Sequence, residues 1–323
     1  MLIWIIDEEW KDYDLEREIL EKEFPGVEIK TSTYDYKKDL EEFGYKADGV
    51  LAQVYADLPK EVIEKFENLK GIATYGGGYD RIDIDTCKEK NIHVTNIQGY
   101  CAEDLADYTI AAMFYGNKKI AQYNSRIVED IKSNRWGAQA VDENVHRLSS
   151  STLLIIGFGA IGKEIAKKAK ALNVNVIAYD EFLSEEEIAK YGVKKVGWEE
   201  GFKEADFVSV NLKGIDANKD KLTINEFKLM KKTAYVINTS RGKVIKEDDL
   251  IQAAKEGLIA GAILDVVKVE PPTGDEEIFK CENIIITPHV SYISYESFRA
   301  LKEFALQNLI AMIKGEEPRD FVC

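Results

Sequence analysis

The sequence is poor in residues on which several classes of protein depend. Among its 323 residues there are four cysteines, Cys87, Cys101, Cys281 and Cys323, and their wide separation indicates neither a disulfide framework nor a metal-ligand cluster. We therefore expect reduced thiols in a cytoplasmic protein that has no metal site. Histidine occurs only three times, so each histidine can be weighed individually as a candidate for catalysis.

Long apolar runs and an excess of basic residues are also missing. No apolar run approaches the roughly 20 residues that span a bilayer, and the first residues lack the basic segment of a signal peptide. The net charge is -15 and the pI is near 4.9, so the chain would repel phosphate backbones and anionic lipid. We expect a soluble protein that binds neither nucleic acid nor a membrane.

The first hundred residues alternate between short apolar segments and amphipathic, charge-rich ones. Residues 12–24 and 59–69 carry apolar side chains at helical spacing, and Pro59 suits a first helical turn. This βαβ rhythm predicts a small parallel sheet. Its strands should be buried on both faces, because they are nearly continuous in apolar and β-branched residues. They are predicted at residues 2–7, 27–32, 49–54, 71–76 and 92–97.

The second half repeats the rhythm more regularly. Six strands are predicted, at residues 153–159, 175–180, 207–212, 234–239, 261–267 and 283–290. With intervening helices they fit a doubly wound sheet. Residues 102–119 predict a long helix that is apolar over much of its circumference and must be buried against something, whereas residues 129–151 resemble a connector. Residues 295–314 predict a final helix with no strand after it.

The segment GFGAIG has the glycine spacing of a dinucleotide-binding loop, between a predicted strand and a predicted helix. Gly157 permits a tight turn, Gly159 lets the backbone approach a pyrophosphate, and Gly162 allows the helix to pack closely. The helix N-terminus supplies N–H donors. Asp180 ends the next strand, where a carboxylate can accept from a ribose 2′-OH. Because Glu181 follows it and no arginine is nearby in the sequence, we expect NAD rather than NADP.

Three further segments of the second half carry candidates for chemistry. Arg241 follows a strand, and its planar guanidinium could clamp a carboxylate. Asp265 ends a strand, Glu270 precedes two prolines, and His289 follows a strand in the half that carries the glycine loop. A carboxylate beside an imidazole favours the imidazolium, as a general acid requires. A surface arginine and a structural histidine are the alternative interpretations.

The sequence resembles the D-isomer-specific 2-hydroxyacid dehydrogenases over most of its length. The segments that carry the resemblance are GIATYGGGYDRIDID, GYCAEDLADYT, LLIIGFGAIG with Asp180, NTSRG, ILDVVKVEPP and TPHVSY. The resemblance implies an α/β fold with two doubly wound parallel-sheet domains. A flavodoxin-like substrate-binding domain, residues 1–99 and 292–323, would be interrupted by a Rossmann NAD-binding domain, residues 100–291. It also implies a homodimer built around the NAD-binding domain, which would bury the helix at residues 102–119.

The resemblance further implies a role for individual residues. NADH would deliver hydride to C2 of a 2-keto acid, and His289 would donate a proton while Glu270 keeps it protonated. Arg241 would bind the substrate's carboxylate and carbonyl. The backbone of Gly77 and Gly78 would meet the other carboxylate oxygen, and Tyr100 would lie beside the substrate. The other implied cofactor contacts are Asp265 at the nicotinamide carboxamide, Ala160 and Ile161 at the pyrophosphate, Thr239 and Ser240 on the nicotinamide side, and Leu212 and Lys213 near the adenine.

Two segments depart from the family pattern. Leu105-Ala106-Asp107 stands where V-A-E is usual, and Asn211-Leu212-Lys213 stands where H-x-P is common, so that Lys213 could alter cofactor affinity.

Several functions remain open at this point. Phosphoglycerate and phosphite oxidation are alternatives within the family, and an NAD(H)-sensing, corepressor-like binding protein is the alternative from another class. Formate dehydrogenases match poorly, since they carry Gln where Glu270 stands. A small or aryl-substituted 2-keto acid is favoured over a phosphorylated one, because no basic cluster beyond Arg81 adjoins TYGGGYD. The particular acid and the physiological direction are not indicated.

Overall fold

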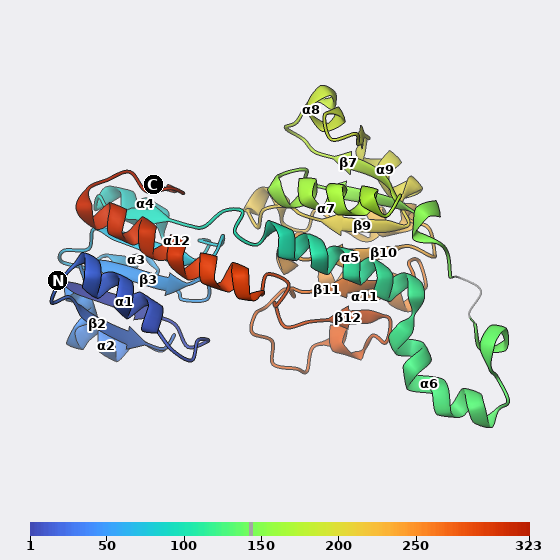
Figure 1. Ribbon diagram of the computed structural model, residues 1–323, viewed down its shortest axis with the longest axis horizontal. Coiled ribbons are helices and arrows are strands. Elements are labelled where there is room, and N and C mark those ends of the chain that lie inside the picture. The colour runs from blue at the N-terminus through green and yellow to red at the C-terminus, as the bar shows by residue number, and fades with distance from the viewer. Residues whose placement is uncertain (142–144) are drawn as a thin grey trace. The chain divides into compact units, whose positions relative to one another are not determined.

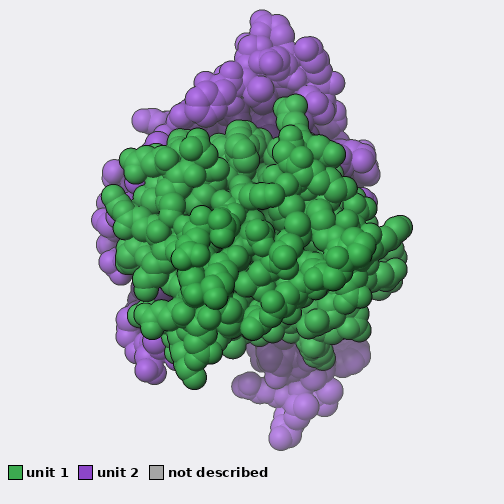
Figure 2. Space-filling view, turned by 90° about the vertical axis from the view of Figure 1, so that its left-hand side faces the viewer, with its two compact units in different colours: residues 1–100, 294–323 green, residues 101–293 purple. Residues whose placement is uncertain are grey.

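The chain folds into two compact units in the computed structural model, which describes residues 1–141 and 145–323 (Figures 1 and 2). The first unit comprises Met1–Tyr100 and Ser294–Cys323, and the second comprises Cys101–Ile293. The chain therefore leaves the first unit, builds the second, and returns with its last helix. Residues 142–144 of the predicted connector lie outside the described residues.

The first unit is built on a small parallel sheet, as predicted, and its strand order is β2-β1-β3-β4-β5. Its strands are β1 (Leu2–Ile6), β2 (Glu28–Ser32), β3 (Gly49–Gln53), β4 (Gly71–Tyr75) and β5 (His93–Thr95). The prediction that all strands are buried on both faces is wrong for β2, most of which is exposed or half-buried. This strand lies at the edge of the sheet and has a neighbour on one side only.

Five helices accompany this sheet in the described residues: α1 (Asp14–Glu23), α2 (Lys37–Glu42), α3 (Lys60–Ile63), α4 (Ile84–Glu89) and α12 (Tyr295–Lys314). Helix α12 has the predicted bounds and packs on β3, β4 and β5 beside α1. The helix predicted for residues 59–69 is wrong in extent. It ends after one turn: the N–H groups of Lys65 and Phe66 bond three residues back, and that of Glu67 bonds to the carbonyl oxygen of Tyr45 outside the helix.

The second unit holds a parallel sheet in the order β12-β11-β10-β9-β6-β7-β8. Its strands are β6 (Thr152–Ile156), β7 (Asn175–Tyr179), β8 (Lys194–Lys195), β9 (Phe207–Val210), β10 (Tyr235–Asn238), β11 (Gly261–Leu264) and β12 (Ile284–Ile286). All six predicted strands are present. The seventh, β8, consists of two lysines at the edge and has no apolar pattern that could have predicted it. The strand order reverses at β6, which is where doubly wound sheets bind ligands.

Helices of the second unit in the described residues are α5 (Ala102–Lys118), α6 (Ile120–Lys132), α7 (Ala160–Ala171), α8 (Glu185–Ala189), α9 (Trp198–Glu204), α10 (Ile224–Leu229) and α11 (Glu247–Lys255). Helix α5 packs against α7 and contacts β10 and β11, which explains its apolar circumference. Helix α6 was not predicted. It follows Lys119, whose backbone is left-handed (φ 50°) and separates the two helices. Within residues 1–141 and 145–323, no helix combines the length and apolar character needed to cross a membrane.

Two apolar layers cover the two faces of the second sheet. Along β6, Leu154 and Ile156 belong to one layer, and Leu153 and Ile155 belong to the other. Alternate side chains of a strand point to opposite faces, so Leu153 to Ile156 are all buried, while Thr152 at the start of β6 is half-buried. The carboxyl end of β6 is thereby held firmly where the glycine loop begins.

Candidate active site

The glycine loop joins β6 to α7 and has the geometry of a dinucleotide cradle. Gly157 has a φ of 88°, and a Cβ atom there would lie 2.6 Å from the carbonyl oxygen of Asn211, which follows β9. A Cβ atom at Gly162 would lie 2.5 Å from the carbonyl oxygen of Gly157, whereas one at Gly159 would meet nothing within 4 Å. The N-terminus of α7 has no side-chain cap. These features suit a pyrophosphate group that approaches the bare backbone at Gly159 and accepts from the helix N–H groups.

Asp180 lies just after β7 and is fixed by backbone groups. One carboxylate oxygen accepts from the N–H of Phe158 at 2.8 Å, and the other accepts from the N–H groups of Phe182 and Leu183 at 2.9 and 3.0 Å. Burial alone would raise the pKa of Asp180, but these bonds and the charge of Lys195 together lower it below the ordinary value. The loop is therefore accompanied by a negative charge that does not depend on a bound ligand.

Glu181 lies next to Asp180 and pairs with a cation that is distant in the sequence. The Nζ of Lys221 is 2.7 Å from Oε1 of Glu181. The sequence considered alone shows no arginine near Asp180, and Lys221 follows Glu181 by 40 residues. A positive charge therefore lies beside this carboxylate pair, although Glu181 already engages it.

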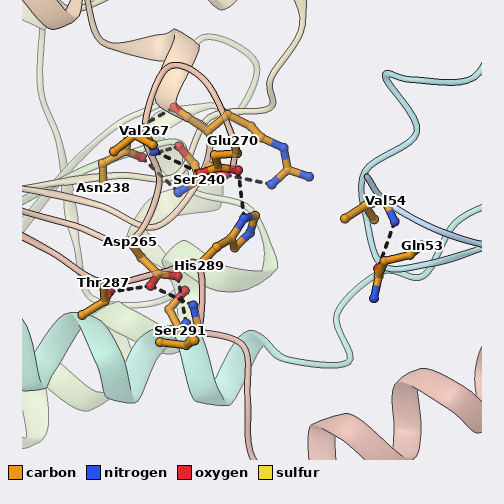
Figure 3. A network of polar contacts seen from close by, with 12 residues as sticks. Gln53, Val54, Asn238, Ser240, Asp265, Val267, Glu270, Thr287, His289 and Ser291 are labelled. Carbon is orange, nitrogen blue, oxygen red and sulfur yellow. Dashed lines mark hydrogen bonds and ion pairs between the residues drawn. The ribbon is translucent and has the colours of Figure 1, made fainter. Parts of the chain in front are cut away.

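His289 and Glu270 form a hydrogen-bonded pair in the second unit. The Nδ1 of His289 lies 3.0 Å from Oε2 of Glu270, and each side chain is 18% exposed. The other carboxylate oxygen of Glu270 accepts from the N–H of Val267 at 3.0 Å. Burial alone would raise the pKa of Glu270, but His289, Val267 and the charge of Arg241 lower it below the ordinary value. Figure 3 shows this pair among its neighbours.

Asp265 holds the loop that carries His289. Its carboxylate is 1% exposed and accepts from the hydroxyl of Thr287 at 2.5 Å and from the N–H groups of Val290 and Ser291 at 2.9 and 2.8 Å (Figure 3). The N–H of His289 in turn donates to the carbonyl oxygen of Asp265 at 2.9 Å.

The loop also has an anchor on α5 and an unusual backbone conformation. The hydroxyls of Tyr108 and Thr287 are 2.6 Å apart, which links α5 to this network. His289 has a φ of 54°, a left-handed conformation that is uncommon outside glycine and requires support from its surroundings. The hydrogen bonds of Asp265 to this loop supply that support. Asp265 therefore has a structural role in the site besides the cofactor contact that the resemblance implies.

Arg241 is the third residue after β10 and lies in the turn that follows this strand. Asn238, the last residue of β10, fixes this turn, because its amide accepts from the N–H and the hydroxyl of Ser240 and donates to the carbonyl oxygen of Arg241. The guanidinium donates to the carbonyl oxygen of Ser240 at 2.8 Å. Gly214 leaves room for this side chain, since a Cβ atom there would lie 2.5 Å from Cγ of Arg241.

Strands β10, β11 and β12 are neighbours in the sheet, and Arg241, Glu270 and His289 all lie in segments that follow their carboxyl ends. The structure therefore brings the three predicted catalytic side chains to one edge of the second sheet. The remaining predicted cofactor residues lie near the glycine loop or in the turn after β10. Ala160 and Ile161 are the first residues of α7, Leu212 contacts the position of Gly157, Lys213 follows Leu212, and Thr239 is buried.

Gly77, Gly78 and Tyr100 belong to the first unit. The glycines follow β4, and the carbonyl oxygen of Gly77 accepts from the side chain of Asn96 at 2.9 Å. Within the described ranges, no acceptor bonds to the N–H groups of Gly77 and Gly78. Successive backbone N–H groups can bind an anion where the chain conformation turns them to the same side. The predicted site residues thus divide between the units, with Gly77, Gly78 and Tyr100 in the first and the others in the second.

One doubly wound sheet carries a glycine cradle with an adjoining carboxylate, and it also carries a His–Glu pair beside an arginine. This combination indicates a nicotinamide-dependent oxidoreductase. The comparison with known families agrees with this class. A profile described as the D-isomer specific 2-hydroxyacid dehydrogenase, NAD binding domain, matches residues 110–291. The chain belongs to this family, and it is therefore an NAD-dependent dehydrogenase.

Individual relatives match over nearly the whole chain. A glyoxylate reductase of Thermococcus litoralis is 35% identical over 282 residues, which are 86% of this chain and 84% of that protein. A D-3-phosphoglycerate dehydrogenase of Archaeoglobus fulgidus is 31% identical over 92% of this chain and 55% of its own. Among solved structures, the D-lactate dehydrogenase of Aquifex aeolicus with NAD and lactic acid is 28% identical, with a TM-score of 0.86 over 99% of this chain and 98% of that one.

Proposed function

We propose that this protein reduces a small or aryl-substituted 2-keto acid reversibly to the D-2-hydroxy acid. The observation that carries the proposal is the pair formed by His289 and Glu270, 3.0 Å apart, on the sheet edge that also holds Arg241. Two similar proteins are named glyoxylate reductase and D-lactate dehydrogenase. Both names refer to short 2-keto or 2-hydroxy acids. Their names support the substrate class and leave the particular acid open.

Each member of the pair has a distinct task in the proposed reaction. NADH supplies the hydride that C2 of the keto acid receives. His289 donates a proton to the carbonyl oxygen from Nε2, because Nδ1 is the nitrogen that faces Glu270. Glu270 remains ionised and stabilises the imidazolium that precedes the proton transfer. In the reverse direction the same nitrogen accepts the proton.

Arg241 and the first unit bind the substrate in this proposal. The guanidinium of Arg241 makes a planar, bidentate contact that fits a carboxylate and the adjoining carbonyl. The N–H groups of Gly77 and Gly78 bind the other carboxylate oxygen, and Tyr100 lies beside the substrate. Residues 1–99 and 292–323 would thus form the substrate-binding domain.

The proposed contacts of NAD lie in the second unit. They comprise Gly157, Gly159, Ala160, Ile161, Gly162, Asp180, Leu212, Lys213, Thr239, Ser240 and Asp265. The ionised carboxylate of Asp180 favours a ribose 2′-OH and repels a 2′-phosphate, which supports a preference for NAD over NADP. Because Glu181 already binds Lys221, this lysine does not offset that repulsion fully.

We also propose a homodimer in the cytoplasm, assembled through the second unit. Helix α6 exposes several aliphatic side chains, and contiguous exposed apolar surface commonly marks an interface. The homodimer would bury this surface together with part of α5.

Phosphoglycerate oxidation is the second candidate, because the Archaeoglobus fulgidus relative carries that name. A panel of substrates separates the candidates. We expect NADH-dependent reduction of glyoxylate, pyruvate, hydroxypyruvate or an aryl or branched 2-keto acid, with kcat/KM well above that for 3-phosphohydroxypyruvate, and a D product by chiral chromatography. Tight NADH binding without turnover of any acid would instead favour a sensor. The Arg241→Gln variant serves as the matched control, since it should retain NADH binding and lose keto-acid affinity.

A further inference from the structure

Lys302 is a buried cation of α12 that faces α1 and the segment before it. It is 5% exposed, and its Nζ lies 3.2 and 3.3 Å from the two carboxylate oxygens of Glu16, which is fully buried in α1. The Nζ also donates to the carbonyl oxygen of Asp12 at 3.0 Å. The ammonium group thus donates hydrogen bonds to Asp12 and Glu16 and forms an ion pair with the same glutamate.

Aromatic rings surround the same ammonium group. Its Nζ lies 4.4 Å from the ring centre of Trp10, and 5.6 and 5.5 Å from those of Tyr13 and Phe298. Rings at such distances attract a cation and shield it from water. These contacts hold the ammonium group of Lys302 in one place. Lys302 is therefore a fixed point between α12 and the segment that follows β1.

Glu16 connects this fixed point to the glycine loop of the first unit. The hydroxyl of Tyr75 donates to Oε1 of Glu16 at 3.1 Å. Tyr75 is the last residue of β4 and immediately precedes Gly76, Gly77 and Gly78. Burial and the charge of Glu16 hold the pKa of Tyr75 well above its ordinary value, so the hydroxyl remains a donor at physiological pH.

Helix α12 reaches the same loop by a second route. The side chain of Asn308 donates to the carbonyl oxygen of Asn96 at 3.2 Å, and the side chain of Asn96 donates to the carbonyl oxygen of Gly77 at 2.9 Å. The loop is therefore tied to one helix at Tyr75 and at Gly77, on either side of Gly76. The N–H groups of Gly77 and Gly78 are the part of the loop left for an anion.

Stability alone does not account for a buried ion pair at this place. Removing two charges from water costs several kcal/mol for each ion, and apolar replacements of similar volume are often at least as stable. A pair that is retained despite this cost is consistent with a demand for one defined geometry. Here the geometry concerned is that of Tyr75, which immediately precedes the glycine loop of the first unit.

We propose that Lys302 and Glu16 are positioning residues that act through Tyr75 to hold the N–H groups of Gly77 and Gly78 in place for the substrate's carboxylate. The inference rests on the proposed function of that loop. It places neither residue in contact with the substrate. It therefore predicts weaker binding of the keto acid with little change in the chemical step or in cofactor binding.

The test compares steady-state kinetics of the full-length protein and three variants on the best 2-keto acid of the substrate panel. Tyr75→Phe keeps the ring and removes its bond to Glu16. The double variant Glu16→Gln, Lys302→Met removes both charges together, so no unpaired charge is left buried. Lys314→Met is the matched control, because Lys314 pairs with Glu23 between the same two helices at their other ends, at 2.6 Å.

We expect Tyr75→Phe and the double variant each to raise KM for the keto acid about tenfold, with kcat within about twofold and KM for NADH unchanged. A fourth variant that combines Tyr75→Phe with the double change should raise KM for the keto acid no further, because both interrupt one connection. Lys314→Met should leave every constant unchanged. Folding is checked by circular dichroism and Tm, and if the double variant does not fold, Tyr75→Phe decides.

The outcomes separate this inference from the function on which it rests. A wild-type protein that reduces no 2-keto acid overturns the proposed function, and this inference with it. An active wild-type protein with unchanged keto-acid KM in folded Tyr75→Phe and in the folded double variant overturns the inference alone. Equal effects in Lys314→Met would also overturn it, since they would reflect general loosening of the helix pair.

Discussion

The Nδ1 of His289 lies 3.0 Å from Oε2 of Glu270, while the backbone N–H of the same histidine bonds to the carbonyl oxygen of Asp265. Two acidic residues on one connected segment after β11 thus fix the imidazole at its ring and at its backbone. A ring held at Nδ1 presents Nε2 in a defined direction, which is the requirement for a general acid.

Replacement of His289 by alanine should remove the proton donor. General acid catalysis contributes about 10²- to 10⁴-fold, so kcat for reduction should fall by that factor while the Kd for NADH stays unchanged. Stopped-flow and steady-state measurements with the preferred keto acid check both values. A variant that retained near-normal reduction would show that another group supplies the proton.

The two directions of the reaction should respond oppositely to pH. Reduction needs a protonated donor and oxidation needs an unprotonated acceptor at the same nitrogen, so both pH profiles should share one apparent pKa with opposite slopes. In Glu270→Gln, kcat/KM for reduction should fall, because the imidazolium loses its counter-charge. Profiles of kcat/KM for both directions test this, and parallel profiles would contradict it.

Glu270 should also make stability depend on pH. Its pKa is lowered from an ordinary value of 4.5 in the folded protein, so the folded state binds this proton less readily than the unfolded chain. The ionised form therefore stabilises the fold above pH 4.5, and this stabilisation is lost as the pH falls through the folded pKa. The Tm difference between wild type and Glu270→Gln should be larger at neutral pH than below pH 4.5. A Tm difference that becomes larger on acidification would contradict this prediction.

Asp265 provides a test of loop anchoring against cofactor binding. Asp265→Asn replaces an acceptor oxygen by a donor and leaves a buried N–H group unpaired, which should cost about 1–3 kcal/mol and lower kcat through displacement of His289. Thr287→Val removes one of the same bonds without changing Asp265. If anchoring dominates, both variants should lower kcat and leave the Kd for NADH nearly unchanged. If Asp265 acts mainly on the carboxamide, only Asp265→Asn should weaken NADH binding.

The glycine loop and the final helix could be predicted because their signals are local. The loop is predicted by the spacing of Gly157, Gly159 and Gly162 alone. Helix α12 is predicted by the apolar periodicity between Tyr295 and Lys314. Each of these patterns is complete within some twenty residues. The parallel sheets follow for the same reason, since each buried strand is a short apolar segment.

Partners that are distant in the chain could not be predicted in this way. Lys221 follows Glu181 by 40 residues, and Lys302 follows Glu16 by 286. Nothing in the local pattern around either lysine distinguishes it from a solvated one. Only the folded topology brings these charges together, and the same holds for the contacts that Asp265 makes with the His289 loop.

Helix α6 was missed for a different reason, and it leads to the final prediction. Its aliphatic residues are not buried within the described chain, and the sequence around them was interpreted as a connector from residue 129 onward. Ile120, Val128 and Ile131 are 66%, 60% and 57% exposed. They lie eight and three residues apart, so they share one helical face. An exposed aliphatic face of this kind stabilises α6 only if another surface covers the face.

We expect a second copy of the chain to cover this face. Val128→Lys combined with Ile131→Lys should therefore shift the protein from dimer to monomer, because two ammonium groups would have to be desolvated in the interface. Analytical ultracentrifugation at several concentrations measures the change. Ile215→Lys, at an exposed isoleucine of the second unit outside α6, should leave the dimer intact. A wild-type protein that is monomeric at every concentration would contradict the proposed dimer.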